Sequence, residues 1–310
     1  MKKPRAPREG RPWVSCPACH EMMYIVDDYI IWHFESKPVK CGKCGAMLDW
    51  WVTARREVEN NFMYNKAFAF VGARETWFTL ILKTGERKVY RFSENGIPAG
   101  SKVLYVNYTP QGPGSFPAEI HGNVPTRRFF SDQVALYPVP LGGQESVDET
   151  EVSVFVSWVP STSADDSWQS LVDAFEDYSH ERYSSMVVPA NVAVESALSR
   201  LLNSYLQRFV SKKQRVEDFL DMAATYSHQL NVLLPMIASL NGIPDLPDPI
   251  RGALNSLRGL RNDLAHDGVT GSPLNTSIAA ELLCGALFGF HYVRYVANRL
   301  PPLSVTTNKA

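Results

Sequence analysis

The sequence is poor in long apolar runs, in net charge and in cysteine. No apolar run approaches the ~18 residues that a membrane-spanning helix needs. The formal net charge is only −1, so no general attraction to nucleic acid or to a membrane surface is expected. The N-terminal residues lack the apolar core of a signal peptide, and four of the five cysteines lie in metal-ligand spacing. These features favour a protein of the reducing cytoplasm without a membrane partner.

The residues that are present indicate a packed chain with several domains. Its 310 residues suffice for two or three domains, and hydrophobic residues make up 45% of them. The sequence therefore predicts an α+β multidomain protein with an N-terminal zinc ribbon, a central all-β sandwich or barrel and a C-terminal α-helical bundle. The expected segments are a basic disordered tail over 1–12, the ribbon over 13–62, the β domain over 63–160, the helical domain over 161–300 and a tail over 301–310.

The β segment shows short runs rich in Val, Tyr, Phe and Thr, separated by glycine-containing turns. The expected strands are Lys66–Val71, Thr76–Lys83, Arg87–Phe92, Lys102–Tyr108 and Val152–Val159, with Arg127–Tyr137 less regular. Strands at this spacing are typical of a sandwich or barrel. No recognisable catalytic set lies in this segment, and His121 is interpreted as a turn residue.

Apolar residues recur at helical spacing in the C-terminal segment. A first helix is expected to end at Pro189, and a third is expected to kink at Pro235. The fourth should start with Asp248 as its cap and Pro249 in its first turn. It should end near His266, because Gly268 supplies the residue favoured just past a helix. The last helix reaches about residue 300 and contains the fifth cysteine, which we interpret as buried and unreactive. Together these helices predict a bundle.

Two CxxC turns carry the strongest signal. Cys16 and Cys19 form one pair, and Cys41 and Cys44 form the other. Two such turns complete a closed tetrahedral site for one structural zinc ion. The alternative, disulfide pairing, is disfavoured in the cytoplasm. His20 and His33 are possible substitute ligands.

Basic and aromatic side chains surround the cysteines. They are Lys37, Lys40, Lys43, Arg55 and Arg56, with Trp32, Phe34, Trp50 and Trp51. Such a mixture can bind single-stranded nucleic acid. The interpretation we favour is that the tryptophans pack the ribbon against the β segment, because so small a domain needs apolar support.

The fourth predicted helix ends with the run Leu260-Arg-Asn-Asp-Leu-Ala-His-Asp-Gly268. This run resembles the signature of the HEPN superfamily, an all-helical fold that includes many endoribonucleases. Arg261 and Asn262 match the first two motif positions, and His266 matches the last. The resemblance covers roughly residues 163–300 and does not reach the ribbon or the β segment. It implies that these three residues carry catalysis.

The chemistry of the three side chains suits RNA cleavage without a metal. Histidine can transfer the protons of the 2′-hydroxyl and of the leaving 5′-oxygen. The planar guanidinium of Arg261 can neutralise the phosphorane, and Asn262 can orient either group. The alternative is a surface arginine and a histidine that merely caps the helix C-terminus.

A single copy of the motif is an incomplete site. Residues five apart on a helix differ by ~140° in direction, so Arg261 and His266 do not share one face. Family resemblance implies that two protomers pair through the helical domain so that both motifs line a composite cleft.

Two further features are candidate contacts. Arg200, Arg208, Lys212, Lys213 and Arg215 form a basic stretch that can follow an RNA backbone or can be a solvated helix end. Glu195 lies on an early helix where related domains carry a polar residue facing the site.

The sequence thus favours a metal-independent endoribonuclease, of the kind found in toxins and antiviral-defence proteins, with RNA as substrate. An antitoxin or a trigger ligand is a possible further partner. The alternatives are a non-catalytic HEPN-fold protein that binds a nucleic acid or a nucleotide, and a zinc-ribbon DNA-binding regulator.

Overall fold

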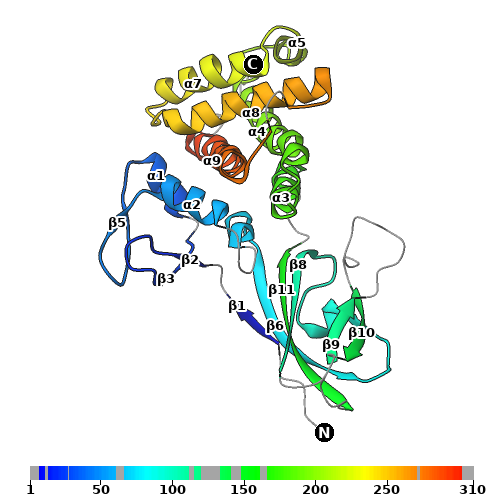
Figure 1. Ribbon diagram of the computed structural model, residues 1–310. Helices are drawn as coiled ribbons and strands as arrows, with labels where there is room; N and C mark the ends of the chain where they lie inside the picture. Colours follow the sequence, from blue (N-terminus) through cyan, green and yellow to red (C-terminus); the bar gives the residue numbers. More distant parts are fainter. Residues whose placement is uncertain are drawn as a thin grey trace, which may run out of the picture. The chain divides into compact units, whose positions relative to one another are not determined.

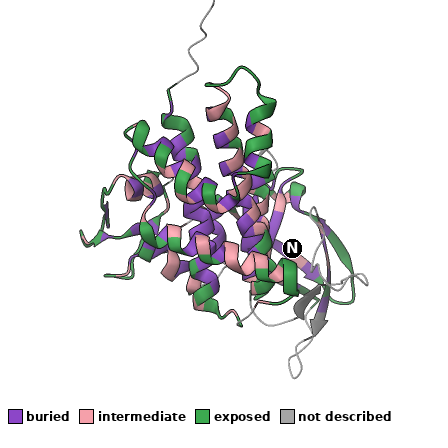
Figure 2. Cartoon of the chain, turned by 90° about the horizontal axis from the view of Figure 1, so that it is seen from above, coloured by how far each residue is buried: buried purple, intermediate pink, exposed green. Residues whose placement is uncertain are grey.

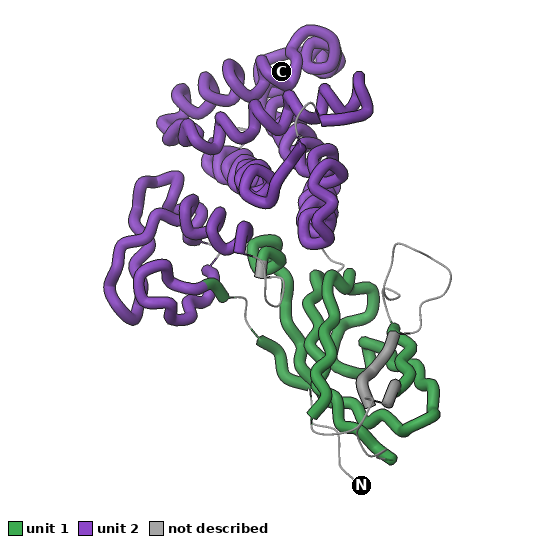
Figure 3. The backbone as a smooth tube through the Cα atoms, in the orientation of Figure 1, with its two compact units in different colours: residues 1–14, 61–164 green, residues 15–60, 165–310 purple. Residues whose placement is uncertain are grey.

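The computed structural model describes residues 7–10, 13–26, 28–60, 66–111, 115–119, 133–140, 148–160, 166–270 and 273–301. Contacts divide the chain into two units (Figure 3). Unit 1 holds residues 1–14 and 61–164, and unit 2 holds residues 15–60 and 165–310. These units are not the successive segments suggested by the sequence, because the cysteine segment (residues 15–60) joins the C-terminal helices.

Unit 1 is built from antiparallel strands (Figure 1). They are β1 (Arg8–Gly10), β6 (Arg74–Lys83), β7 (Lys88–Arg91), β8 (Lys102–Pro110), β9 (Ser115–Glu119), β10 (Gln133–Pro140) and β11 (Glu149–Val159). One sheet has the order β1-β6-β11-β8, and a second has the order β7-β10-β9. The two sheets share one core, to which Phe78 of β6, Leu136 of β10 and Val154 of β11 contribute.

The strand predictions for this unit were correct in most places. Among the described residues the segment Lys66–Val71 is the exception, because it forms the 3-10 helix η1. Residues 127–132 of the predicted strand Arg127–Tyr137 lie outside the described residues. Its residues from Ala67 to Val71 are all buried, so the apolar run carries no alternation that separates strand from helix. A second 3-10 turn, η2, covers Phe92–Asn95.

Part of the basic N-terminal tail is ordered. Residues 8–10, which the sequence assigned to a disordered tail, form β1, and Arg8 lies opposite Trp77 of β6. The expectations for residues 1–6, for His121 and for the tail beyond residue 301 lie outside the described residues.

Unit 2 contains the helices and the short strands of the cysteine segment. The strands are β2 (Trp13–Ser15), whose first residues the division assigns to unit 1, β3 (Met22–Tyr24), β4 (Val39–Lys40) and β5 (Met47–Leu48). The helices are α1 (Asp28–Phe34), α2 (Trp50–Glu59), α3 (Asp166–Ser179), α4 (Tyr183–Leu206), α5 (Gln214–Met222), α6 (Tyr226–His228), the π-helical turn η3 (Gln229–Leu233), α7 (Leu234–Leu240), α8 (Asp248–Asp267) and α9 (Thr276–Arg299).

Two proline predictions differ from the structure. Pro189 does not end a helix but lies inside α4, where burial of its neighbours Val187 and Ala190 offsets the lost backbone hydrogen bond. The break comes earlier, at Glu181, which has a φ of 58°. Pro235 lies at the start of α7, directly after the π-helical turn, so the third predicted helix is divided into four shorter elements, α5, α6, η3 and α7.

Helix α9 packs against α1, α2, α3, α4 and α8, so it is the centre of unit 2. Figure 2 shows buried residues gathered between the helices and exposed residues on their outer faces. It is long and apolar enough to span a membrane, but 72% of its apolar window is buried inside the fold, as in a core helix. Glycines let α8 approach closely, since a Cβ on Gly285 would come within 2.6 Å of the Ala253 Cβ. A Cβ on Gly289 would come within 2.7 Å of Leu254. This contact fixes the position of α8.

The cysteine segment packs on the same helix. The ring of Phe34 in α1 lies 5.3 Å from that of Tyr292, and Trp51 in α2 lies 5.2 Å from Phe288. An ion pair of 2.9 Å joins Arg55 to Glu281. The preferred sequence interpretation placed the tryptophans against the β segment, whereas Trp51 packs on α9 because that helix offers an aromatic row.

Candidate functional site

The four clustered cysteines converge on one point. Their sulfur atoms all lie within 4.8 Å of one another. The Sγ atoms of Cys16 and Cys44 are 3.9 Å apart, as are those of Cys19 and Cys41. These separations exclude disulfide bonds. They match the edge of about 3.8 Å expected for four thiolates at 2.3 Å from a tetrahedral zinc ion. The donor set is therefore compatible with a metal site.

The two CxxC turns have the same backbone geometry. The amide of Cys16 donates to the carbonyl oxygen of Glu21, and the amide of Cys41 donates to that of Ala46, both at 2.9 Å. The residue four positions after the first cysteine has a positive φ in each turn: 61° for His20 and 75° for Gly45. His20 is thus an exposed turn residue and is not part of the cluster.

The backbone prepares part of the cluster for loss of a proton. Amide N–H groups of Cys44 and Lys43 lower the pKa of Cys41 to about 6. Cys19 moves the other way: the Glu21 amide lowers its pKa, but burial and hydrogen bonds from the other three thiols raise it to about 12. Thiols this close compete for protons, and a bound cation relieves that competition.

His33, Trp50 and Trp51 of the cysteine segment have structural roles. Burial lowers the pKa of His33, although Asp49 opposes the shift, and its ring lies 5.4 Å from Phe288. His33 is therefore a packing residue rather than a ligand. Trp50 and Trp51 are also buried, so they are not free to stack on the bases of a nucleic acid.

The motif residues lie in the C-terminal half of α8. The helix ends as the sequence predicts, with Gly268 at a φ of 72° and its amide bonded to Leu264. Asp248 is the first helical residue rather than the cap, and Pro249 follows it. The guanidinium of Arg261 donates to the side-chain oxygen of Asn262 at 3.2 Å.

Arg261 and Asn262 line a polar pocket of about 300 Å³ between α4, α8 and the start of α6. Glu195, which the sequence suggested as a candidate contact, is in the same pocket. The amide nitrogen of Asn191 donates to its carboxylate at 2.9 Å. The remaining lining residues are Thr225, Tyr226, Ser227 and Arg258. A pocket of this size is at the lower end of the range for small ligands.

Three buried polar atoms of this pocket have no hydrogen-bond partner within the described chain. They are the side-chain oxygen of Asn191, the hydroxyl of Tyr226 and the Nε of Arg258. Asn191 is 1% exposed and Tyr226 is 8% exposed. Burial and the charge of Glu195 raise the pKa of Tyr226, and Arg258 opposes the shift. Because unpaired buried polar groups are rare and costly, the cluster indicates a missing partner.

His266 lies outside this pocket. It follows Asn262 by four residues, so its Cα is about 6 Å further along the helix on nearly the same side. The side chain is exposed, and within the described part of the chain it has no hydrogen-bond or ion-pair partner. One chain thus brings Arg261, Asn262 and Glu195 together and leaves His266 at the free end of the helix.

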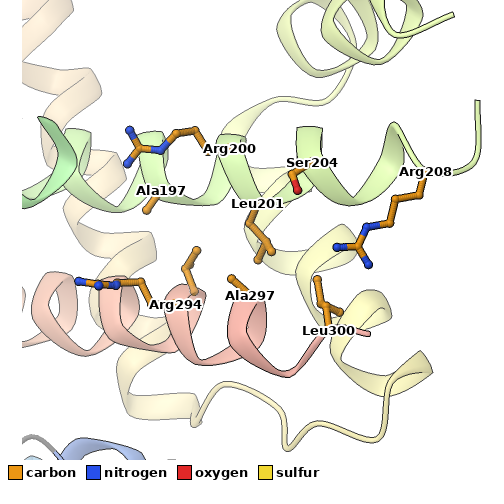
Figure 4. A pocket seen from close by; sticks show the side chains of 9 residues that line it. Ala197, Arg200, Leu201, Ser204, Arg208, Arg294, Ala297 and Leu300 are labelled. Carbon is orange, nitrogen blue, oxygen red and sulfur yellow. The ribbon is translucent and has the colours of Figure 1, made fainter. Parts of the chain in front are cut away.

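A second hollow follows the opposite side of α4, where it faces α9 (Figure 4). Its volume is about 250 Å³. Arg200 and Arg294 extend from the two helices at one end, and Arg208 lies at the other. Arg208 donates to the carbonyl oxygen of Pro301 at 2.7 Å. Among its lining residues the hollow has no acidic side chain, so it carries a positive charge. We call it the arginine groove.

Sequence reasoning found only part of this arrangement. It found Arg200 and Arg208 but missed Arg294, and it missed Asn191, Tyr226 and Arg258 in the polar pocket. Arg258 could have been found from the sequence, because it precedes Arg261 by three residues and so lies on the same side of the predicted helix. Lys212, Lys213 and Arg215 are exposed near the start of α5 and do not line the groove. No protein-family model, curated protein or solved structure matches this chain.

Proposed function

We propose that this protein is a metal-independent endoribonuclease with a HEPN-like helical domain. The observation that carries the proposal is the grouping of Arg261, Asn262 and Glu195 in one pocket, with His266 one turn further along the same helix. The pocket supplies two guanidinium groups for a phosphate. The exposed imidazole of His266 supplies a group that can take up or give a proton during the reaction.

The proposed reaction needs only the RNA and the motif side chains, with a second imidazole supplied by another copy of the chain. A 2′-oxygen attacks the adjacent phosphorus while its proton moves to a base, and the bond from phosphorus to the 5′-oxygen breaks. The leaving 5′-oxygen takes a proton from an acid, which leaves a 2′,3′-cyclic phosphate and a 5′-hydroxyl. Arg261 neutralises the charge of the phosphorane, and Asn262 holds the guanidinium in place.

The position of His266 favours a site completed by a second copy. One chain offers one motif histidine, His266, whereas the reaction needs a base and an acid. An apolar stripe on η3 and α7 is available for pairing: Val232, Met236 and Leu240 recur every four residues and are 53%, 47% and 72% exposed. We propose a homodimer in which these stripes meet, as a two-fold axis allows.

The other parts fit supporting roles. The arginine groove, on the opposite side of α4, can bind phosphates of the same RNA further from the cleaved bond. Cys16, Cys19, Cys41 and Cys44 would hold one zinc ion, which would stabilise the cysteine segment without taking part in the reaction. We place the protein in the cytoplasm, as a toxin or antiviral-defence effector whose unit 1 responds to a trigger or an antitoxin.

One observation favours a second candidate function. His266 is not in the pocket, and a polar pocket with unpaired buried groups also suits a non-catalytic protein that binds a nucleotide. The DNA-binding regulator is less well supported, since Trp50 and Trp51 of the cysteine segment are buried. The two surviving candidates differ in whether His266 is needed.

Cleavage of single-stranded RNA tests the proposal. The full-length protein should cut RNA in EDTA, at a concentration that leaves protein-bound zinc in place, and should not cut where the scissile nucleotide is 2′-deoxy. His266→Ala should lower the rate by roughly 10²–10⁴. His180→Ala is the matched control, because His180 is also exposed at a helix end. If His266→Ala cuts RNA at the wild-type rate, the non-catalytic binding protein becomes the favoured candidate.

A further inference from the structure

We propose that the polar pocket is a binding site for a guanine nucleotide, so that guanosine is the nucleoside recognised on the 5′ side of the cleaved bond. The binding claim stands on the pocket itself. Its meaning for cleavage rests on the nuclease function proposed above. The inference starts from the hydrogen-bonding character of the groups that the pocket leaves unpaired.

The α4 wall of the pocket presents acceptors. The amide nitrogen of Asn191 is already committed to one carboxylate oxygen of Glu195 at 2.9 Å. A carboxylate can only accept, so this contact also fixes the orientation of the Asn191 amide. The amide oxygen of Asn191 and the second carboxylate oxygen of Glu195 remain. Two acceptors one helical turn apart require a ligand with neighbouring N–H donors.

Guanine alone among the four RNA bases has that pattern on its Watson–Crick edge. Its ring N1–H and its 2-amino group are adjacent donors, and its O6 is an acceptor beside them. Adenine and cytosine place an acceptor next to their amino group, and uracil has one ring N–H between two carbonyls. Read out along this edge, the acceptors of Asn191 and Glu195 select guanine.

The opposite wall supplies what the rest of the nucleotide needs. Tyr226 keeps its proton at neutral pH, because burial and Glu195 raise its pKa, and its unpaired hydroxyl can donate to O6. Arg258 and Arg261 lie one turn apart on α8 and line the same pocket. Guanidinium groups bind phosphate through paired N–H donors. The ligand is thus a guanosine that carries its 3′-phosphate toward the motif.

Calorimetric titration of the full-length, zinc-loaded protein with guanosine 3′-monophosphate tests the site. Inosine 3′-monophosphate differs only by loss of the 2-amino group and should bind about ten- to a hundredfold more weakly. The adenosine, cytidine and uridine 3′-monophosphates should bind more weakly still. Equal affinity for all five nucleotides, or no binding of any, would overturn the proposal and leave bound water as the partner of the three buried atoms.

Two variants with little change in shape test the assigned groups. Glu195→Gln replaces an acceptor by an amide, and Tyr226→Phe removes one hydroxyl, so each should weaken guanosine 3′-monophosphate at least about tenfold. Asn255→Ala is the control, because Asn255 is on α8, is bonded to Asn231 and does not line the pocket. Unchanged affinity in both variants, with native circular dichroism, contradicts the assignment.

Sequencing the ends of cleaved RNA separates this inference from the nuclease. Cuts that follow guanosine support both claims. Cuts without base preference retain the nuclease and contradict the guanine site. Selective binding of guanosine 3′-monophosphate without any cleavage retains the site and contradicts the nuclease.

Discussion

The indole ring of Trp51 meets the ring of Phe288 edge-on, with centroids 5.2 Å apart and an interplanar angle of 86°. Trp51 belongs to the cysteine segment, and Phe288 is in the middle of α9. Both side chains are buried, and Tyr178 adds a hydrogen bond of 2.9 Å to the carbonyl oxygen of Val58. The cysteine segment therefore contributes to the stability of the helices in its own unit.

Trp51→Ala should destabilise the helices. Loss of a buried tryptophan costs about 3–5 kcal/mol, and the side chain removed here covers α9. Urea unfolding followed by circular dichroism at 222 nm measures the change. Val52→Ala is the control, because Val52 is 58% exposed on the same helix and should shift stability by less than about 0.5 kcal/mol. Equal effects of the two variants would contradict the contact.

Removal of the proposed zinc ion should also destabilise the helices. Elemental analysis of protein purified without added metal should find about one zinc ion per chain. Cys41→Ser, or extraction with a strong chelator, should lower the midpoint of helix unfolding rather than unfold the cysteine segment alone, because α1 and α2 rest on α9. A metal-free protein with an unchanged midpoint would refute the structural role.

Gly285→Ala tests the close approach of α8 to α9. The added methyl group would come within 2.6 Å of the Ala253 Cβ and 3.5 Å of its backbone carbon, so the helices must separate. Overpacking of this kind costs about 1–3 kcal/mol. Gly252→Ala on α8 is the matched control, since its Cβ would meet nothing within 4 Å. If Gly285→Ala is as stable as this control, the packing of these helices differs from the described one.

Leu240→Glu should weaken the proposed dimer. A charge at the end of the apolar stripe opposes burial of that stripe, whereas the folded monomer tolerates it because Leu240 is 72% exposed. Light scattering over a dilution series gives the dissociation constant, which should rise at least about tenfold. Val52→Glu, at an exposed site on α2, should leave it unchanged. A wild-type chain that is monomeric yet cleaves RNA would exclude the composite site.

The stability of unit 2 should fall as the pH is lowered from 7.5 to 5.5. Burial, aided by Arg294, lowers the pKa of His291 to about 4, whereas the unfolded chain titrates near 6.5. Between these values the unfolded state binds more protons, so acidification favours unfolding by about 1 kcal/mol over this range. Urea titrations of the wild type and of His291→Gln measure the difference. The variant should lose that part of the pH dependence, and an identical slope would exclude His291 as its source.

The salt dependence of RNA binding should report on the arginine groove. Each neutralised phosphate of a single strand contributes about −0.7 to the slope of log K against log salt. Arg294→Gln should reduce the magnitude of the slope by about that amount, because Arg294 is exposed in the groove. Arg182→Gln, an exposed arginine paired with Asp177, serves as the control. An unchanged slope for Arg294→Gln places the RNA elsewhere.

Features set by local backbone chemistry could be predicted from the sequence. The CxxC spacing predicts the cysteine cluster because each turn is a local structure, and Gly268 marks the end of α8 because its φ is positive. The polar pocket could not be predicted in full. Asn191 and Tyr226 reach Arg261 only through the packing of separate helices, and no local pattern encodes that packing. Lys66–Val71 was misassigned because uniform burial erases periodicity.

Unit 2 is built from two separate stretches of the chain, residues 15–60 and 165–310, and the first is synthesised well before the second. Trp51 leaves the exit tunnel roughly 10–50 s before Phe288 at ordinary rates of translation. During that interval the aromatic face of the cysteine segment has no helix to cover it, while the CxxC turns are complete. Capture of the proposed zinc ion would therefore precede tertiary assembly, and the nascent chain exposes a chaperone-accessible aromatic surface until the last helix is synthesised.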